Sequence, residues 1–136
     1  MSAFQDYIYR MATIRRFEDI QAWQKARELV QEVYKTSSVG RIGKDYGLRD
    51  QIQRAAVSAM SNIAEGFARK SRKDFSHFLS IARASAVEVQ SLLYVAFDTT
   101  GIDHGQFEML YHKADEVISM ATRLMTYLNK KESPLQ

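Results

Sequence analysis

The sequence has no cysteine, only one proline and only six glycines among its 136 residues. Without cysteine the chain can form no disulfide framework and offers no thiolate for catalysis. One proline leaves few places where a helix must break. No apolar run approaches the roughly 20 residues that a membrane-spanning helix needs, and the N-terminus lacks the apolar core of a signal peptide. These absences predict a cytoplasmic protein without a membrane segment.

The charge is spread unevenly along a chain whose length and composition suit one globular domain. The net charge is +3, but residues 41–83 hold nine lysines and arginines against four acids, a local charge of +5. Residues 84–136 carry a local charge of −3. This asymmetry points to an anionic partner for the middle of the chain. The alternative is a solvated surface that is basic without binding anything.

Apolar residues recur at steps of three and four, which predicts helices rather than strands. Four such stripes cover residues 20–34, 48–67, 75–96 and 107–128, and residues 37–47 are predicted to form a loop. Asp19, Ser71 and Asp103 are the expected N-caps, and Gly101 is the expected end of the third helix. Short links after the second and third helices favour antiparallel neighbours. The predicted fold is therefore all-α, an antiparallel up-down-up-down four-helix bundle.

The predicted bundle covers residues 17–132, between an N-terminal arm of residues 1–16 and a C-terminal tail of residues 133–136. The arm has helically spaced apolar residues followed by arginines that keep no clear register. It could be a flexible arm, an extra helix against a neighbour, or a product of the wrong start site, since Met11 could itself be the first residue.

Several motifs resemble those of the bacterial 23S rRNA intervening-sequence proteins. They are the runs 17–20 and 23–26, the Asn-Ile-Ala-Glu-Gly run at residues 62–66, and Ala82-Arg83 followed by Ser85. The resemblance covers about residues 17–130. It implies a four-helix subunit that assembles into a ring-like homopentamer with no established enzymatic activity. Some members are encoded within insertions in 23S rRNA genes, and a related accessory protein of diversity-generating retroelements is a basic pentamer that binds nucleic acid and a reverse transcriptase.

A basic run between the second and third predicted helices is the candidate nucleic-acid site. It contains Arg69, Lys70, Arg72 and Lys73, and only Asp74 offsets them locally. Cations in the first turn of a helix oppose its dipole, at a cost of about 0.3 to 1 kcal/mol each. That cost makes sense if a phosphate docks there, because cations and unbonded N–H groups would converge on it. A solvated end of the bundle is the competing interpretation.

A second candidate is a polar network set into the apolar stripe of the second helix. Asn62 and Glu65 lie three residues apart, Arg54 lies on roughly the same side, and Arg83 on the third helix could reach Glu65. A buried carboxylate needs a cation and hydrogen bonds to stay charged. We therefore interpret these residues as structural, within a subunit or between subunits. Gly66 beside them is interpreted as a close-packing position.

An enzymatic function is not indicated. The three histidines form no Ser/His/acid order, and Asp74-x-x-His77 is the nearest approach to a di-iron motif. Neither a phosphate-binding glycine loop nor zinc-ligand spacing is present. The sequence therefore predicts a protein without catalytic residues, metal or cofactor, which binds RNA or DNA as part of a ribonucleoprotein. The alternative is an assembly or scaffold protein that binds other proteins and has no nucleic-acid role.

Overall fold

The computed structural model describes residues 14–132, and all regular structure in that range is helical. A short 3-10 helix, η1, precedes five α-helices. The elements are η1 (Phe17–Asp19), α2 (Gln21–Ser37), α3 (Gly40–Lys44), α4 (Tyr46–Ala68), α5 (Arg72–Thr100) and α6 (His104–Glu132). The predicted tail, and all of the predicted arm before residue 14, lie outside the described residues.

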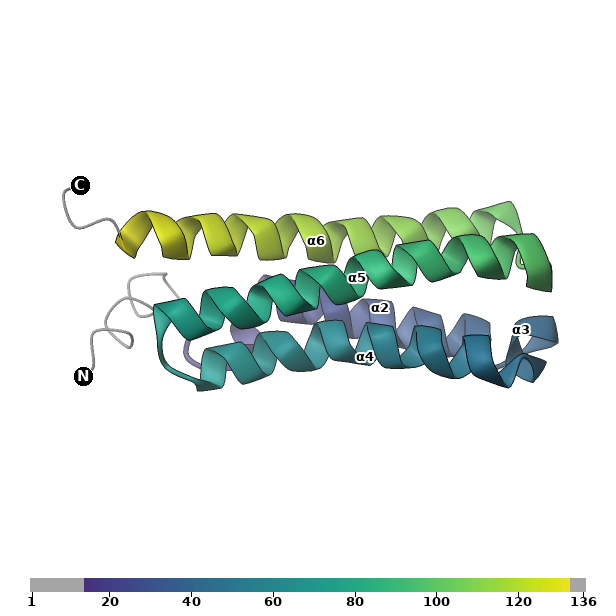
Figure 1. Ribbon diagram of the computed structural model, residues 1–136, viewed down its shortest axis with the longest axis horizontal. Helices are drawn as coiled ribbons and strands as arrows, with labels where there is room; N and C mark the ends of the chain where they lie inside the picture. The colour runs from purple at the N-terminus through teal and green to yellow at the C-terminus, as the bar shows by residue number, and fades with distance from the viewer. Residues whose placement is uncertain (1–13, 133–136) are drawn as a thin grey trace.

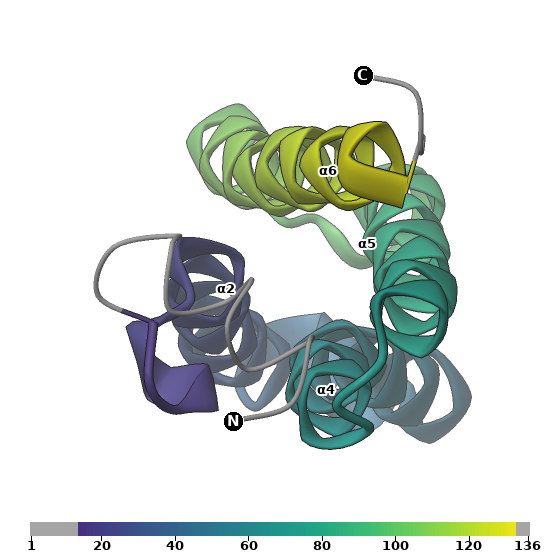
Figure 2. The same cartoon turned by 90° about the vertical axis from the view of Figure 1, so that its left-hand side faces the viewer.

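The four long helices lie side by side, and each runs opposite to the one before it (Figure 1). Seen end on, they surround a common interior in the order α2, α4, α5, α6 (Figure 2). Each packs against two neighbours: α4 against α5, α5 against α6, and α2 against both α4 and α6. No helix in the described part of the chain is long and apolar enough to cross a membrane.

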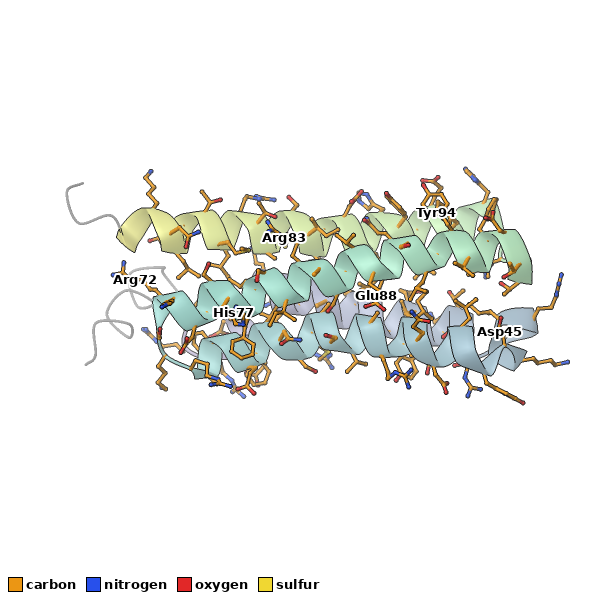
Figure 3. All side chains as sticks on the ribbon, viewed as in Figure 1. Asp45, Arg72, His77, Arg83, Glu88 and Tyr94 are labelled. Atoms are coloured by element: carbon orange, nitrogen blue, oxygen red, sulfur yellow. The ribbon has the colours of Figure 1, made fainter. Side chains whose placement is uncertain are left out.

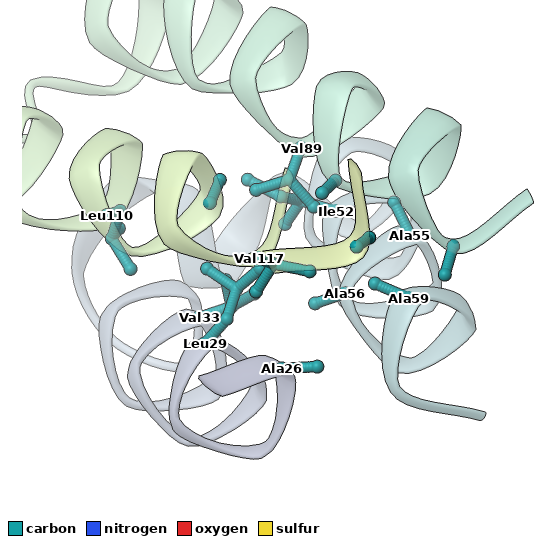
Figure 4. Close-up of a cluster of buried hydrophobic side chains, with 14 of the residues drawn as sticks. Ala26, Leu29, Val33, Ile52, Ala55, Ala56, Ala59, Val89, Leu110 and Val117 are labelled. Atoms are coloured by element: carbon teal, nitrogen blue, oxygen red, sulfur yellow. The ribbon is translucent and has the colours of Figure 1, made fainter. Parts of the chain in front are cut away.

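Small side chains fill much of the interior, which lets the helix backbones approach closely. Alanines with no exposed surface occur on all four long helices, among them Ala26, Ala56, Ala86 and Ala114. Larger residues such as Leu29, Ile52, Val89 and Val117 pack between them (Figure 4). Interiors of this kind tolerate little change in side-chain volume. The apolar stripes of the sequence therefore correspond to one continuous core.

Polar pairs fix how α5 and α6 are aligned. Ser76 donates to Asn129 at 3.2 Å, Arg83 to Thr122 at 3.3 Å, and Gln90 to Asp115 at 2.8 Å. The members of successive pairs lie seven residues apart on each helix, the repeat of left-handed helix packing. A slip of α6 along α5 would break all three pairs at once.

The helix ends confirm some of the predicted caps and correct others. Ser71 caps α5 by accepting a hydrogen bond from the Asp74 backbone. Asp103 caps α6 by a hydrogen bond of the same kind. Gly101 ends α5 with a φ of 77°. The prediction for Asp19 is wrong: its carboxylate accepts from the backbone of residues 15 and 16, so it closes η1 rather than capping α2. The predicted loop 37–47 contains α3, because Ile42 buries its side chain in the core.

Candidate nucleic-acid interface

The basic run lies at the turn between α4 and α5, at one end of the molecule. α4 ends at Ala68, and Lys70 turns the chain with a left-handed φ of 58°, which non-glycine residues rarely adopt. Arg72 begins α5 and extends from the end of the helices in Figure 3. This turn brings the four predicted cations, Arg69, Lys70, Arg72 and Lys73, into one local surface. We call these four residues the basic turn.

The four cations of the basic turn have different surroundings. Arg69 is held in place, with its Nε 3.5 Å from the Glu65 carboxylate and its guanidinium 4.8 Å from the centre of the Phe78 ring. Lys70 and Lys73 are exposed, whereas Arg72 is half-buried. The two lysines are therefore the cations most accessible to an anion in solution. Arg69 offers a charge that is partly offset but fixed in position.

The start of α5 adds backbone donors to these charges. The first N–H groups of a helix have no acceptor within the helix. Ser71 takes up the N–H of Asp74, while Arg72 and Lys73 occupy the two helical positions before it. Dipole and cations together create a positive potential at this end, opposed locally by Asp74 and Glu65. The arrangement is suited to binding a phosphate.

The other cations of the basic segment do not join this surface. Arg41 donates to the Thr99 carbonyl, and Arg49 donates to Asp50 and to the Gly43 carbonyl while lying over the Tyr46 ring. These groups lie around the start of α4, whose 23 residues span roughly 35 Å. The cations of residues 41–83 are therefore spread over the molecule, and only part of the local charge of +5 lies at the basic turn.

The predicted buried network around Glu65 is wrong within the subunit. The Glu65 side chain is 52% exposed, and the ion pair that it makes is with Arg69 on its own helix. Arg54 is exposed, and Arg83 donates to Thr122 on α6. The reason is angular: Ile63 faces the core, and a residue two positions further along lies on the opposite side of a helix.

Asn62 does take part in a polar contact between α4 and α5, with partners different from those predicted. It donates to the Ser58 carbonyl at 2.8 Å and to the Ser58 hydroxyl at 3.0 Å. That hydroxyl lies 2.8 Å from the hydroxyl of Ser85 on α5. The contact is neutral and fully hydrogen-bonded, so it aligns the helices without burying a charge. Neither serine was part of the predicted network, although Ser58 lies four residues from Arg54 and Ser85 two residues from Arg83.

Gly66 is the close-packing position that the sequence predicted. A Cβ atom at this residue would lie 2.7 Å from the Cβ of Phe78 and 3.1 Å from a ring carbon of Phe75. The glycine thus permits α4 to meet the first turns of α5 directly behind the basic turn. Among residues 14–132, no three histidine or carboxylate side chains are placed to hold a metal ion.

An all-helical chain with a cationic turn at one end is the class of protein that this geometry defines. Residues 18–123 match the 23S rRNA-intervening sequence protein family, and the chain belongs to that family. A solved structure from Bacteroides thetaiotaomicron, described as a protein of unknown function from the S23 ribosomal protein family, has the same fold with a TM-score of 0.71. It is 24% identical in sequence, and the match covers 77% of this chain and 95% of that one. No curated protein matches the chain.

Proposed function

We propose that the chain is a non-enzymatic four-helix-bundle subunit of a cytoplasmic homopentamer that binds RNA or DNA through the phosphate backbone. The basic turn is the observation that carries this proposal. Four cations stand within five residues there, and three of them, Arg69, Lys70 and Lys73, are exposed. No other part of the described chain concentrates exposed cations to this degree. Binding of this kind positions a protein on nucleic acid without reading its sequence.

The physical reason for assigning the basic turn to a ligand is its local cost. Arg72 and Lys73 lie in the first turn of α5, where the helix dipole disfavours positive charge. Neither is needed to cap the helix, because Ser71 does that. A bound phosphate would offset the repulsion between the cations and the helix dipole, since its oxygens attract both the cations and the helix N-terminus. The basic turn is thus better explained by binding than by folding.

The pentamer is the assembly that resemblance to the family implies, and exposed apolar residues support it. Val57 on α4 and Val87 and Val95 on α5 are exposed. A closed ring uses two different surfaces of each subunit, and these valines lie on two helices. Five symmetry-related basic turns would strengthen binding to one nucleic acid by multivalency.

A fluorescence-anisotropy titration with labelled RNA and labelled duplex DNA tests the proposal. The variant Lys70→Ala/Arg72→Ala/Lys73→Ala should weaken both interactions, because phosphate contacts are common to both nucleic acids. A matched control removes the same charge elsewhere, at the exposed residues Lys35, Lys44 and Arg54. The control should retain most of the affinity. Equal losses in both variants would show that net charge, rather than the basic turn, determines binding.

Wild-type protein that binds neither nucleic acid would favour the alternative function, a protein assembly or scaffold. In that case the exposed apolar residues on α4 and α5 would be the functional surface, and the basic turn would only be solvated.

A further inference from the structure

Four aromatic side chains cluster at the end of the α5–α6 pair that is distant from the basic turn. They are Tyr94 and Phe97 on α5 and Phe107 and Tyr111 on α6. The ring centres of Tyr94 and Phe107 are 4.9 Å apart, those of Phe97 and Phe107 are 5.4 Å apart, and those of Phe107 and Tyr111 are 5.6 Å apart. We call these four residues the aromatic cluster. Figure 3 shows Tyr94 and Arg72 toward opposite ends of α5.

The aromatic cluster is both exposed and well supported. Phe107 is only 8% exposed and forms its base, whereas Tyr94 is 53% and Phe97 is 41% exposed. The two outer rings pack edge-on or tilted against that base, so their positions are fixed before anything binds. Exposed aromatic groups held rigidly in this way are typical of protein interaction sites.

Carboxylates surround the aromatic cluster. Asp98 follows Phe97 and is exposed, and its carboxylate makes no hydrogen bond or ion pair with another described residue. Glu108 and Asp115 lie three residues before and four residues after Tyr111 on α6, so both are on its side of that helix. Burial raises the pKa of Tyr111, and Tyr94 and the two carboxylates raise this pKa further. Glu108 is 3.7 Å from His104, and Asp115 accepts a hydrogen bond from Gln90. The local charge is opposite in sign to that of the basic turn.

This combination does not suit nucleic acid. Exposed aromatic rings can stack on bases, but the phosphates of the same strand would then approach Asp98, Glu108 and Asp115. A cation is the complementary ligand, because aromatic faces and carboxylates both attract it. Arginine fits best, since its planar guanidinium stacks on rings and also bonds to carboxylates.

Elsewhere in the chain, arginines pack on aromatic rings. Arg49 lies 4.7 Å from the Tyr46 ring centre, and Arg69 lies 4.8 Å from that of Phe78. Within the described residues no cation lies over a ring of the aromatic cluster, and the nearby Arg41 is bonded to the Thr99 carbonyl. The aromatic cluster therefore has the chemistry of an arginine site without an arginine of its own subunit.

We propose that the aromatic cluster and its flanking carboxylates dock an arginine-containing basic segment of a partner protein. The subunit would then have two functional ends, with nucleic acid at the basic turn and a basic protein segment at the aromatic cluster. The second site rests on contacts of α5 and α6 alone. It is tested without nucleic acid, so it can fail or succeed independently of the proposed function.

Calorimetry of the full chain with two synthetic peptides tests this inference. One peptide carries four arginines separated by glycine and serine, and the other carries four lysines at the same positions. The arginine peptide should bind more tightly, although the protein has a net charge of +3. Tyr94→Ala removes one ring and should lower the affinity for the arginine peptide by about two- to five-fold. Tyr94→Ala/Phe97→Ala removes two rings and should lower this affinity by about ten-fold. Tyr94→Phe should keep the affinity, because it keeps the ring.

Control variants separate the aromatic cluster from general effects of charge and aromatic content. Tyr46→Ala removes another exposed ring, and Asp74→Asn removes an exposed carboxylate at the opposite end of α5. Both should bind the arginine peptide as the wild type does, whereas Asp98→Asn should bind it more weakly. Circular dichroism verifies that each variant is folded, which is expected because the changed side chains are exposed.

Three outcomes would overturn the inference. Equal affinity of the wild type and Tyr94→Ala/Phe97→Ala for the arginine peptide, or no binding by either, would show that the aromatic cluster is not the site. A changed subunit number in light scattering, with unchanged peptide affinity, would assign the aromatic cluster to contacts between copies of this chain. Loss of RNA affinity in the same variant would assign it to base stacking.

Discussion

Replacing Gly66 by alanine tests the packing that places the basic turn. Alanine adds one methyl group, whose carbon would lie 2.7 Å from the Cβ of Phe78. Carbon atoms prefer a separation of about 3.5 to 4.0 Å, so α4 and α5 must separate by about 1 Å or bend locally. The Phe78 Cβ is attached directly to the α5 backbone and cannot rotate out of the way.

The expected cost follows from two opposing terms. Overpacking of this kind typically costs about 1 to 3 kcal/mol. The higher helix propensity of alanine returns about 1 kcal/mol. Gly66→Ala should therefore lower the free energy of unfolding by up to about 2 kcal/mol relative to the wild type, and by about 1 to 3 kcal/mol relative to a Gly→Ala change that meets no clash. Gly47→Ala is the matched control, because the atom nearest to its new methyl carbon is a carboxylate oxygen of Asp45 at 4.0 Å.

Urea unfolding measures both variants at one fixed protein concentration, since the stability of the proposed oligomer would depend on concentration. Gly47→Ala should be as stable as the wild type or slightly more stable. A Gly66→Ala protein as stable as Gly47→Ala would contradict the close approach of α4 and α5, and with it the position of the basic turn.

Three further predictions follow from individual residues. Lys70→Gly should stabilise the fold by about 1 kcal/mol in urea unfolding, because glycine adopts the left-handed φ of this residue without strain; a loss of stability would contradict the turn geometry. Glu65→Ala should change the unfolding free energy by no more than about 0.5 kcal/mol, because the ion pair of Glu65 with Arg69 is half exposed. A loss of stability several times larger would instead support a buried network around Glu65. Burial, Tyr94 and Asp115 raise the pKa of Tyr111 in the folded protein. The stabilisation that neutral Tyr111 contributes is therefore complete below the ordinary tyrosine pKa of about 10, and it is lost as the pH rises through the raised pKa. Tyrosinate absorbance should show a late-titrating component that Tyr111→Phe removes, and a titration curve unchanged in shape would contradict this.

The helices and their ends were largely predictable because their signals are local. Ser71, Gly101 and Asp103 act on residues within a few positions, through hydrogen bonds and backbone geometry that the sequence displays directly. Asp19 shows the limit of this reasoning, since its carboxylate could serve either the helix after it or the turn before it. The stripe positions alone could not distinguish the two.

The polar network failed for a different reason. Asn62 and Glu65 share a side of the helix, but the buried arc of α4 is narrow and ends between them. A rotation of less than one residue step decides whether Glu65 faces Arg83 or solvent, and apolar periodicity does not define the helix rotation so finely. The sequence also could not show that Arg41 and Arg49 lie far from the basic turn, because their contacts with Thr99 and Gly43 depend on how the helices pack.

The aromatic cluster depends on the same packing. Tyr94 and Tyr111 are separated by the turn between α5 and α6, and only the alignment of these helices brings their rings together. The hydrogen bonds between α5 and α6 supply the missing alignment.

The salt dependence of nucleic-acid binding tests the central claim most directly. A plot of log K against log salt for duplex DNA should be linear, with a slope of about −0.9 for each phosphate contacted. The variant Lys70→Ala/Arg72→Ala/Lys73→Ala should flatten that slope by up to about 2.7, and the Lys35, Lys44 and Arg54 control should leave it nearly unchanged. If the slope of the basic-turn variant equals that of the wild type, the phosphates are bound elsewhere and the account is wrong.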